Sequence, residues 1–546
     1  MAERSCHVDA FCANNLPPRE LWPEMDVTSI PDITYAPRLN CAAELLDNAV
    51  AAGLGANTVF LYEGSRWSYA DLLRTANRIA HVLVDDLGIV PGNRVLLRAP
   101  NTPMLAACWF AVLKAGAVVV ATMPLLRRRE ILYTAEKAQI GLALTDTRVA
   151  EDCERGMLFN ADNDERVNAR VVHFNTDASD GLEAMMRGKP DTFANRDTSA
   201  DDIALIAFTS GTTGRAKGTM HTHRDVLAIT DCFARNVLQP DQSDIFCGSP
   251  PLAFTYALGG LLLFPMRFGA STLMLEKASP PQLIQAITDH RPTVCFTAPT
   301  AYRAMLGMLD GHDVSSLRKC VSAGETLPVA TLEAWKAATG VTIIDGIGAT
   351  EMLHIFISAV GDDVRPGSTG RPIPGYQARI VDENGEPVAA GEVGLLEVRG
   401  PTGCRYLDDV ERQRKYVRDG WNLTGDAYRM DSDGYYWYQA RSDDMIVSSG
   451  YNIAAPEVEN ALLTHPAVHE CAVIGIPDPE RGHIVKAFVV LHTEARGEPP
   501  TVKSLQDHVK SEIAPYKYPR AIEFVDALPH TDTGKLQRFR LRETAS

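Results

Sequence analysis

The strongest constraint on the fold is an apolar strand–helix–strand pattern between residues 94 and 121. Arg94-Val-Leu-Leu-Arg98 has the composition of a buried strand, residues 104–113 form an apolar run of helical length, and Gly116-Ala-Val-Val-Val-Ala121 is a second strand. Strands joined through a helix usually lie parallel in one sheet. The alternation recurs as expected strands 203–208, 271–275 and 293–297 and expected helices 225–238 and 280–290. The chain is therefore predicted to have an α/β fold.

The 546 residues exceed what one compact core normally holds, so more than one domain is expected. Residues 376–400 change to short alternating strands with turns at Glu383-Asn-Gly385 and Ala390-Gly391. From residue 441 onward the pattern is a separate α+β unit. We predict an N-terminal part over 1–440, including a β-rich subdomain at about 360–440, followed by a smaller C-terminal domain.

Charge and cysteine content exclude several classes of function. A net charge of -16 argues against a nucleic-acid or anionic-membrane surface, and eleven cysteines without CxxC spacing argue against a disulfide framework or a zinc ribbon. The N-terminus lacks an apolar signal core, and Lys114, Gly116 and Pro124 interrupt the most hydrophobic region, 104–126. We expect a cytoplasmic protein with reduced thiols and no membrane partner.

The segment Phe208-Thr-Ser-Gly-Thr-Thr-Gly-Arg-Ala-Lys-Gly218 follows an expected strand and has the composition of a phosphate-binding loop. Its glycines allow close approach of backbone N–H groups to an anion, its hydroxyls add donors, and Lys217 adds positive charge. It is not a Walker A motif, because Gly218 rather than Ser or Thr follows the lysine. Taken alone, such a loop is also compatible with a solvated turn.

Five further segments accompany this loop. Ser322-Ala-Gly-Glu-Thr-Leu-Pro328 and Asp345-Gly-Ile-Gly-Ala-Thr-Glu351 each follow an apolar strand, where open α/β sheets bind ligands. Asn422-Leu-Thr-Gly-Asp426 precedes Tyr438-Gln-Ala-Arg-Ser-Asp-Asp444, and Leu528-Pro-His-Thr-Asp-Thr-Gly-Lys535 places one lysine after a turn.

With these motifs in this order, the chain from about residue 40 onward resembles the adenylate-forming superfamily of acyl-CoA synthetases, firefly luciferases and peptide-synthetase adenylation domains. Thr350-Glu-Met-Leu-His-Ile-Phe356 and Gly534-Lys-Leu-Gln-Arg-Phe539 look like benzoate-CoA ligases. Leu39-Asn-Cys-Ala-Ala-Glu-Leu-Leu46 and Ser448-Ser-Gly-Tyr-Asn-Ile-Ala-Ala455 look like 2-aminobenzoate-CoA ligases. The resemblance implies two α/β sheets and a small β subdomain in the N-terminal part, a hinge at 441–443, and a mobile C-terminal domain over 444–546.

The implied activity is ATP-dependent and AMP-forming. The acid's carboxylate attacks the α-phosphorus of ATP, pyrophosphate leaves, and the thiol of CoA then displaces AMP. Catalysis of the first step is largely positioning and electrostatic stabilisation. The implied substrates are ATP, CoA and an aromatic acid, 2-aminobenzoate or benzoate, with Mg²⁺ as the metal.

The resemblance assigns the nucleotide site residue by residue. The β- and γ-phosphates would be held by Thr209, Ser210, Gly211, Thr212, Thr213, Gly214 and Lys217. The adenine would be flanked by Asp345 and by the backbone of Ala323, Gly324 and Glu325. Gly346 and Ile347 would belong to the same ATP- and AMP-binding site. Thr350 would contact the α-phosphate, Asp426 the ribose hydroxyls, and Arg441 the ribose or phosphate; an ion pair between Asp426 and Arg441 is the alternative. Glu351 would bind Mg²⁺, or is a surface carboxylate.

Lys535 would be the catalytic cation that bridges the acid and the α-phosphate, although a C-terminal lysine is often simply solvated. Asp443 matches the hinge about which the C-terminal domain rotates between half-reactions. Ser449, Gly450 and Tyr451 would then face the pantetheine of CoA. Asn452 stands where relatives often carry Arg or Lys, so a charged phosphate contact there is in doubt.

The acyl pocket would be walled by Ala253, Phe254, Tyr256, Ala298, Ala323, Gly348, Met352 and His354. Small and aromatic residues favour a flat slot for one ring. Amino-acid-activating relatives usually carry an aspartate within 253–256, which this chain lacks. His354 either hydrogen-bonds a ring substituent or is a satisfied wall residue. Two other functions remain: loading of a carrier protein, and ligand sensing without turnover. The oligomeric state is open, and a homodimer is compatible with the sequence.

Overall fold

The strand–helix–strand pattern that opens the N-terminal part is confirmed by the computed structural model. The structure describes residues 4–158, 169–209, 216–325, 327–382, 384–441, 445–493, 500–529 and 538–545. The pattern forms β3 (Arg94–Arg98), α4 (Pro103–Lys114) and β4 (Val118–Thr122). Thr102 caps α4 by accepting the Leu105 N–H. The second strand begins two residues later than predicted, after Gly116, which has φ +70°.

These strands belong to a six-stranded sheet of order β6-β5-β3-β4-β7-β8, parallel except for β8. Its other strands are β5 (Leu142–Asp146), β6 (Arg170–Phe174), β7 (Ile203–Thr209) and β8 (Lys217–Thr222). Alternate residues of β3 pack on opposite faces: Val95 and Leu97 join the core beside α3 (Tyr69–His81) and α4, whereas Leu96 joins the core beside α5 (Arg128–Lys137) and α6 (Ala150–Leu158). The sheet is therefore a buried layer between helices.

A second sheet has nine strands in the order β15-β14-β13-β12-β11-β9-β10-β1-β2. The six in the middle are parallel, and β2, β14 and β15 add antiparallel edges. The strands are β1 (Thr58–Tyr62), β2 (Ser65–Ser68), β9 (Ile245–Gly248), β10 (Ser271–Leu273), β11 (Val294–Thr297), β12 (Lys319–Ala323), β13 (Ile343–Gly348), β14 (Ile355–Ser358) and β15 (Arg371–Pro372). One face is covered by α11 (Pro280–His290), α12 (Pro299–Leu306) and α13 (Val329–Thr339).

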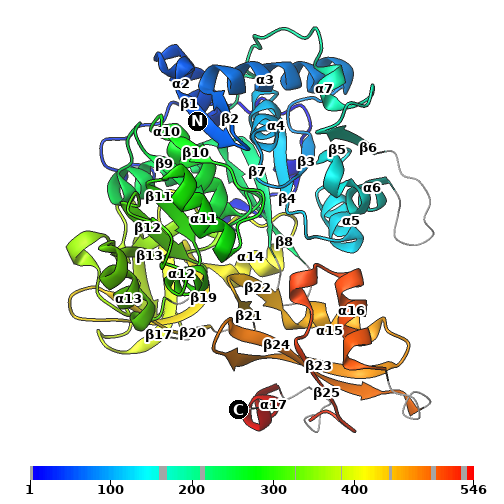
Figure 1. Ribbon diagram of the computed structural model, residues 1–546, viewed down its shortest axis with the longest axis vertical. Coiled ribbons are helices and arrows are strands. Elements are labelled where there is room, and N and C mark those ends of the chain that lie inside the picture. Colours follow the sequence, from blue (N-terminus) through cyan, green and yellow to red (C-terminus); the bar gives the residue numbers. More distant parts are fainter. Residues whose placement is uncertain are drawn as a thin grey trace.

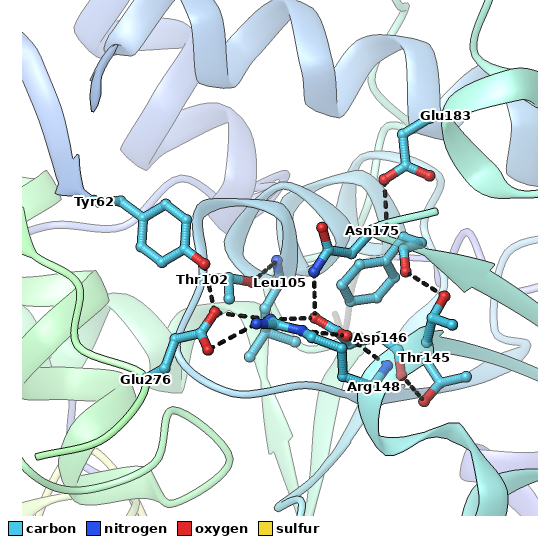
Figure 2. A network of polar contacts seen from close by, with 11 residues as sticks. Tyr62, Thr102, Leu105, Thr145, Asp146, Arg148, Asn175, Glu183 and Glu276 are labelled. Carbon is cyan, nitrogen blue, oxygen red and sulfur yellow. Dashed lines mark hydrogen bonds and ion pairs between the residues drawn. The ribbon is translucent and has the colours of Figure 1, made fainter. Parts of the chain in front are cut away.

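A polar network joins the two sheets beside the ends of β5 and β10 (Figure 2). Arg148 donates to Asp146 Oδ2 and to Glu276 Oε1, each at 2.7 Å, and the Tyr62 hydroxyl donates to Glu276. Hydrogen bonds to these two carboxylates raise the pKa of Arg148. The network fixes the carboxyl end of one sheet beside that of the other.

The predicted β-rich subdomain is a separate antiparallel sheet. It contains β16 (Gln377–Val381), β17 (Val393–Arg399), β18 (Val417–Arg418), β19 (Trp421–Met430) and β20 (Tyr436–Arg441), with α14 (Val410–Tyr416) packed on it. Gly391 has φ +92°, as its predicted turn requires.

The C-terminal residues form a five-stranded sheet with helices on both faces, and Figure 1 shows this unit, coloured orange to red, below the N-terminal part. The strands are β21 (Met445–Ser448), β22 (Tyr451–Ala454), β23 (Val468–Asp478), β24 (Gly482–Leu491) and β25 (Ala521–Phe524). One core lies under α15 (Ala455–Leu463) and α16 (Val502–Glu512), and another under α17 (Arg538–Ala545). The large N-terminal part and smaller α+β C-terminal domain of the predicted fold class are thus present.

The remaining helices are short: α1 (Phe11–Asn14), α2 (Asn48–Ala51), α7 (Leu182–Met185), α8 (His223–Ile229), α9 (Thr255–Ala257) and α10 (Phe264–Arg267). The helix predicted from residue 225 begins at His223, because Thr222 and Asp225 form a capping box, and it continues through Leu238. All eleven cysteines are free. Among the described residues, no helix combines the length and the apolar character that a bilayer span needs.

Candidate active site

A cavity of about 1630 Å³ lies where the two N-terminal sheets and the C-terminal domain meet. Its walls include members of all three predicted sets of site residues. From the nucleotide set come Thr209, Ala323, Gly324 and Thr350; from the acyl set Ala253, Phe254, Tyr256, Ala298, Gly348 and His354; from the CoA set Ser449, Gly450 and Tyr451. The chain thus places these separate sequence motifs around a single space.

Several predicted site residues are not on the cavity wall. Met352 is fully buried and packs in the main N-terminal core, where its carbonyl accepts the Thr402 hydroxyl. Gly346 and Ile347 lie in β13. Ser210, Gly211, Thr212, Thr213, Gly214, Asp443, Lys535 and the side chain of Arg441 lie outside the described residues.

Lys217 and Glu351, predicted to bind phosphate and metal respectively, contact each other. Lys217 Nζ lies 2.5 Å from Glu351 Oε1, and the Tyr406 hydroxyl donates to the same oxygen at 2.6 Å. Burial would raise the pKa of the Glu351 carboxyl, but Lys217 and Tyr406 outweigh it and lower the pKa to about 2. A buried, ionised carboxylate therefore lies beside the ammonium group of Lys217, the first residue of β8.

The backbone between Gly348 and His354 is tightly folded around this pair. Thr350 and Glu351 form one 3₁₀ turn, after which Leu353 has φ +69°, a conformation that is rare for a branched side chain. A Cβ on Gly348 would lie 2.7 Å from the His354 carbonyl oxygen, so only glycine fits there. The buried His221 holds the turn from β8 through a 2.8 Å contact between Nε2 and the Thr350 carbonyl.

Two aspartates of the predicted nucleotide site, Asp345 and Asp426, lie near the Tyr428 hydroxyl. Ser322 donates to Asp345 at 2.5 Å, and burial raises the pKa of Asp345 to about 7. Asp426 lies opposite Arg441 across β19 and β20. Burial raises the pKa of the Tyr428 hydroxyl, and the nearby carboxylates of Asp426 and Asp345 raise it further. The two aspartates from different sheets are therefore close enough to act on one hydroxyl.

The acyl wall combines aromatic rings with an uncharged histidine. Tyr256 donates to the Val321 carbonyl at 3.0 Å, so its hydroxyl is held by the sheet. His354 contacts Tyr256 and Phe264, with ring centroids 5.8 and 4.6 Å away. Burial lowers the pKa of His354 to about 3, which keeps the imidazole neutral.

The Ser449–Gly450 turn brings the C-terminal domain to the cavity. Ser448 pairs with Tyr451, and Ser449 and Gly450 have φ +47° and +80°, the pattern of a two-residue hairpin turn of type I′. The Cβ position of Gly450 lies 3.6 Å from Ala298 Cβ, an ordinary contact. Within the protein itself, backbone conformation rather than lack of space therefore requires glycine at this position.

Sequence reasoning missed four polar residues at or near this site: Tyr406, His221, Glu130 and Lys517. Tyr406 and His221 contact the Thr350–Glu351 turn, whereas Glu130 and Lys517 line the cavity from different domains. None lies in a glycine-rich or strand-end motif, and the partners are far apart in sequence. His221 alone carried a local signal, as a histidine within the extended segment that follows the loop.

The AMP-binding enzyme family matches residues 48–405, and the AMP-binding enzyme C-terminal domain matches residues 457–535. The chain is 36% identical to a benzoate–CoA ligase of Thauera aromatica, over 94% of this chain and 97% of that protein. It is 35% identical to the crystal structure of an anthranilate CoA ligase in complex with anthranoyl-AMP, with a TM-score of 0.71 over 94% and 98% of the two chains.

An amide bond synthetase from Marinactinospora thermotolerans is 27% identical and has a TM-score of 0.83, over 93% of this chain and 99% of that one. Of these two structures, the one with the lower sequence identity has the higher TM-score. The chain belongs to the AMP-binding enzymes of the adenylate-forming superfamily and is an acid–thiol ligase of the acyl- or aryl-CoA type.

Proposed function

We propose that the protein activates a single-ring aromatic acid, 2-aminobenzoate or benzoate, as its acyl-adenylate and transfers the acyl group to CoA. The observation that carries the proposal is the common cavity, which is lined by the nucleotide, acyl and CoA sets together. A carboxylate bound against His354 and Gly348 would lie beside Thr350, the residue proposed to contact the α-phosphate. Such proximity replaces an encounter in solution by a positioned reaction.

The phosphate side is proposed to be Lys217 and Glu351. The low pKa of Glu351 keeps an oxygen anion available at neutral pH, so the residue fits a Mg²⁺ ligand. Bound Mg²⁺ would neutralise phosphate charge. Lys217 would then exchange its contact with Glu351 for the β- and γ-phosphates, and Lys535 would supply the cation between the acid and the α-phosphate.

The acyl wall supports an aromatic rather than an amino-acid substrate. Ala253, Phe254, Tyr256 and His354 contribute no carboxylate to hold an ammonium group. His354 Nε2 lies 3.3 Å from the Tyr256 carbonyl, a contact that assigns the proton to Nε2. Nδ1 is then a buried acceptor that makes no hydrogen bond to the described residues. Nδ1 is covered in the structure without substrate, so an ortho-amino group could donate to it only after the imidazole ring moves, and the proposal of 2-aminobenzoate includes this movement.

The proposal is tested by pyrophosphate release with benzoate, 2-, 3- and 4-aminobenzoate, hydroxybenzoates and a medium-chain fatty acid, each with and without CoA. Mass spectrometry of the products identifies the thioester. We expect 2-aminobenzoate or benzoate to give the highest kcat/KM and a CoA-dependent aryl-CoA product. A preference for the fatty acid would refute the aromatic assignment.

A further inference from the structure

Lys517 of the C-terminal domain is buried against a carboxylate of the N-terminal part. Its side chain is 4% exposed, and Nζ lies 2.6 Å from both Glu130 Oε1 and Glu457 Oε1. Glu457 lies on α15 of the same domain, whereas Glu130 lies on α5, 387 residues away in sequence. One ammonium group therefore links its own domain to the other.

This link stands directly behind the turn that enters the cavity. Tyr516, the neighbour of Lys517, packs against Tyr451 with ring centroids 4.2 Å apart, and Tyr451 packs against Phe254 at 6.3 Å. Tyr451 is the first residue after the Ser449–Gly450 turn. The position of Lys517 is thus coupled to the turn through the contact between Tyr516 and Tyr451, and Tyr451 in turn contacts Phe254 of the N-terminal part.

The contact between Lys517 and Glu130 can break and form again, because each of the two residues has a second polar partner. Glu130 also caps its own helix, because its second oxygen accepts the Arg127 N–H at 2.8 Å. Lys517 likewise has a second partner, Glu457 of its own domain. If the domains separate, each member of the interdomain pair therefore keeps one polar partner, which limits the cost that breaking a buried ion pair usually carries. Burial raises the pKa of Glu457 to about 7, as expected where two carboxylates share one cation.

We propose that Lys517 is a positioning residue for the thioester-forming half-reaction: its contact with Glu130 holds the C-terminal domain in the orientation that places the Ser449–Gly450 turn in the cavity. The proposal rests on the proposed function and on the rotation of the C-terminal domain between half-reactions that the family resemblance implies. Formation and loss of this contact would then set how much of the enzyme is ready for CoA.

A nearby exposed contact provides a comparison. Arg129 and Glu512 also join α5 to the C-terminal domain, with Nη1 and Oε2 2.9 Å apart, but their side chains are 56% and 30% exposed. Ion pairs that are exposed to solvent contribute little to the stability of a contact. The orientation should therefore depend on Glu130 and Lys517 much more than on this pair.

The two half-reactions are measured separately in Glu130→Gln, whose amide oxygen still accepts the Arg127 N–H. Thiolation is followed in single turnover from supplied aryl-adenylate and CoA, and adenylation by ATP–pyrophosphate exchange without CoA. We expect thiolation to slow about 10-fold, the loss that a tenfold smaller competent population gives. Exchange should stay unchanged or rise. Arg129→Gln is the matched control and should alter thiolation by less than about 2-fold.

Lys517→Met and the double variant Lys517→Met/Glu130→Gln complete a cycle. The effects on thiolation should be non-additive, because both substitutions remove the same contact. In the absence of CoA, the backbone amides of residues 445–454 should exchange hydrogen faster in each of the two single variants, Glu130→Gln and Lys517→Met, than in wild type. Normal thiolation in Glu130→Gln, or equal loss of both half-reactions, would overturn the inference. Wild-type protein that forms no aryl-CoA would instead overturn the proposed function.

Discussion

Replacing Glu351 by glutamine removes a negative charge from the centre of the proposed phosphate side. The glutamine side chain has nearly the same shape as the glutamate side chain. The wild-type carboxyl has its pKa lowered from 4.5 to about 2 by Lys217 and Tyr406 acting against burial. Each tenfold change in an acid constant corresponds to about 1.4 kcal/mol, so the folded state stabilises this carboxylate by about 3 kcal/mol. Lys217 is 23% exposed and regains some hydration when its partner is lost. We therefore expect Glu351→Gln to reduce the free energy of unfolding by about 2 kcal/mol at pH 7.

The sign of the pH dependence is fixed by the direction of this pKa shift. A lowered carboxyl pKa gives stabilisation that is complete above 4.5 and is lost as the pH falls toward 2. The difference between wild type and Glu351→Gln in urea unfolding should therefore shrink over that range. The amide does not titrate.

The effect of the substitution on catalysis distinguishes the Lys217–Glu351 contact from an ion pair that serves stability alone. Glu351→Gln should slow ATP–pyrophosphate exchange by about 10²–10³-fold, as loss of one electrostatic group in an active site does, and should shift the Mg²⁺ dependence to higher concentration. Glu397→Gln is the control: Glu397 is 1% exposed and lies 2.7 Å from Arg379 in the β subdomain. The Glu397→Gln variant should be less stable than wild type but should retain normal ATP–pyrophosphate exchange. Exchange in Glu351→Gln within about 3-fold of wild type at unchanged Mg²⁺ would refute the reasoning.

Four further predictions follow from the site. Lys535→Ala should lose about 10²–10³-fold in ATP–pyrophosphate exchange yet keep thiolation of supplied aryl-adenylate; normal exchange would contradict its role. His354→Phe should lower kcat/KM for 2-aminobenzoate about 10-fold relative to benzoate, because Nδ1 is lost as an acceptor; an unchanged ratio would contradict this. Gly450→Ala, at φ +80°, should destabilise the turn by about 1 kcal/mol and slow thiolation more than adenylation, which paired half-reaction assays measure; equal slowing would argue against it. Asp345 has a folded pKa of about 7, raised from 3.8, so stability falls as the pH rises through that interval; Asp345→Asn should remove this part of the pH dependence of unfolding, and an unchanged profile would contradict it.

Local signals were sufficient for much of the fold. Ser68 and Asp71 stand three residues apart in the sequence, which is the spacing of a capping box, and the structure shows this reciprocal pair at the start of α3. The apolar run 104–113 predicted α4 almost to its ends. These features depend on residues close in sequence, so composition and spacing predict them.

The site was predictable as a set of motifs but not as a set of contacts. Lys217 and Glu351 were each assigned a ligand, yet their mutual contact depends on how β8 meets the turn after β13. Tyr406 completes the arrangement from 55 residues beyond Glu351, and no local pattern marks it. Lys517 depends on the orientation of a whole domain. Such contacts depend on tertiary packing between segments that are far apart in the chain, so local sequence patterns do not predict them.

The central claim is that one cavity joins an aromatic acid to the α-phosphate of ATP before CoA enters. It is tested most directly with 2-aminobenzoate carrying ¹⁸O in both carboxylate oxygens, incubated with ATP, Mg²⁺ and CoA. Attack of the carboxylate on the α-phosphorus followed by thiolysis predicts one ¹⁸O atom in AMP, with pyrophosphate and 2-aminobenzoyl-CoA formed in equal amounts. Formation of the thioester with unlabelled AMP, or with ADP and labelled phosphate, would contradict the account.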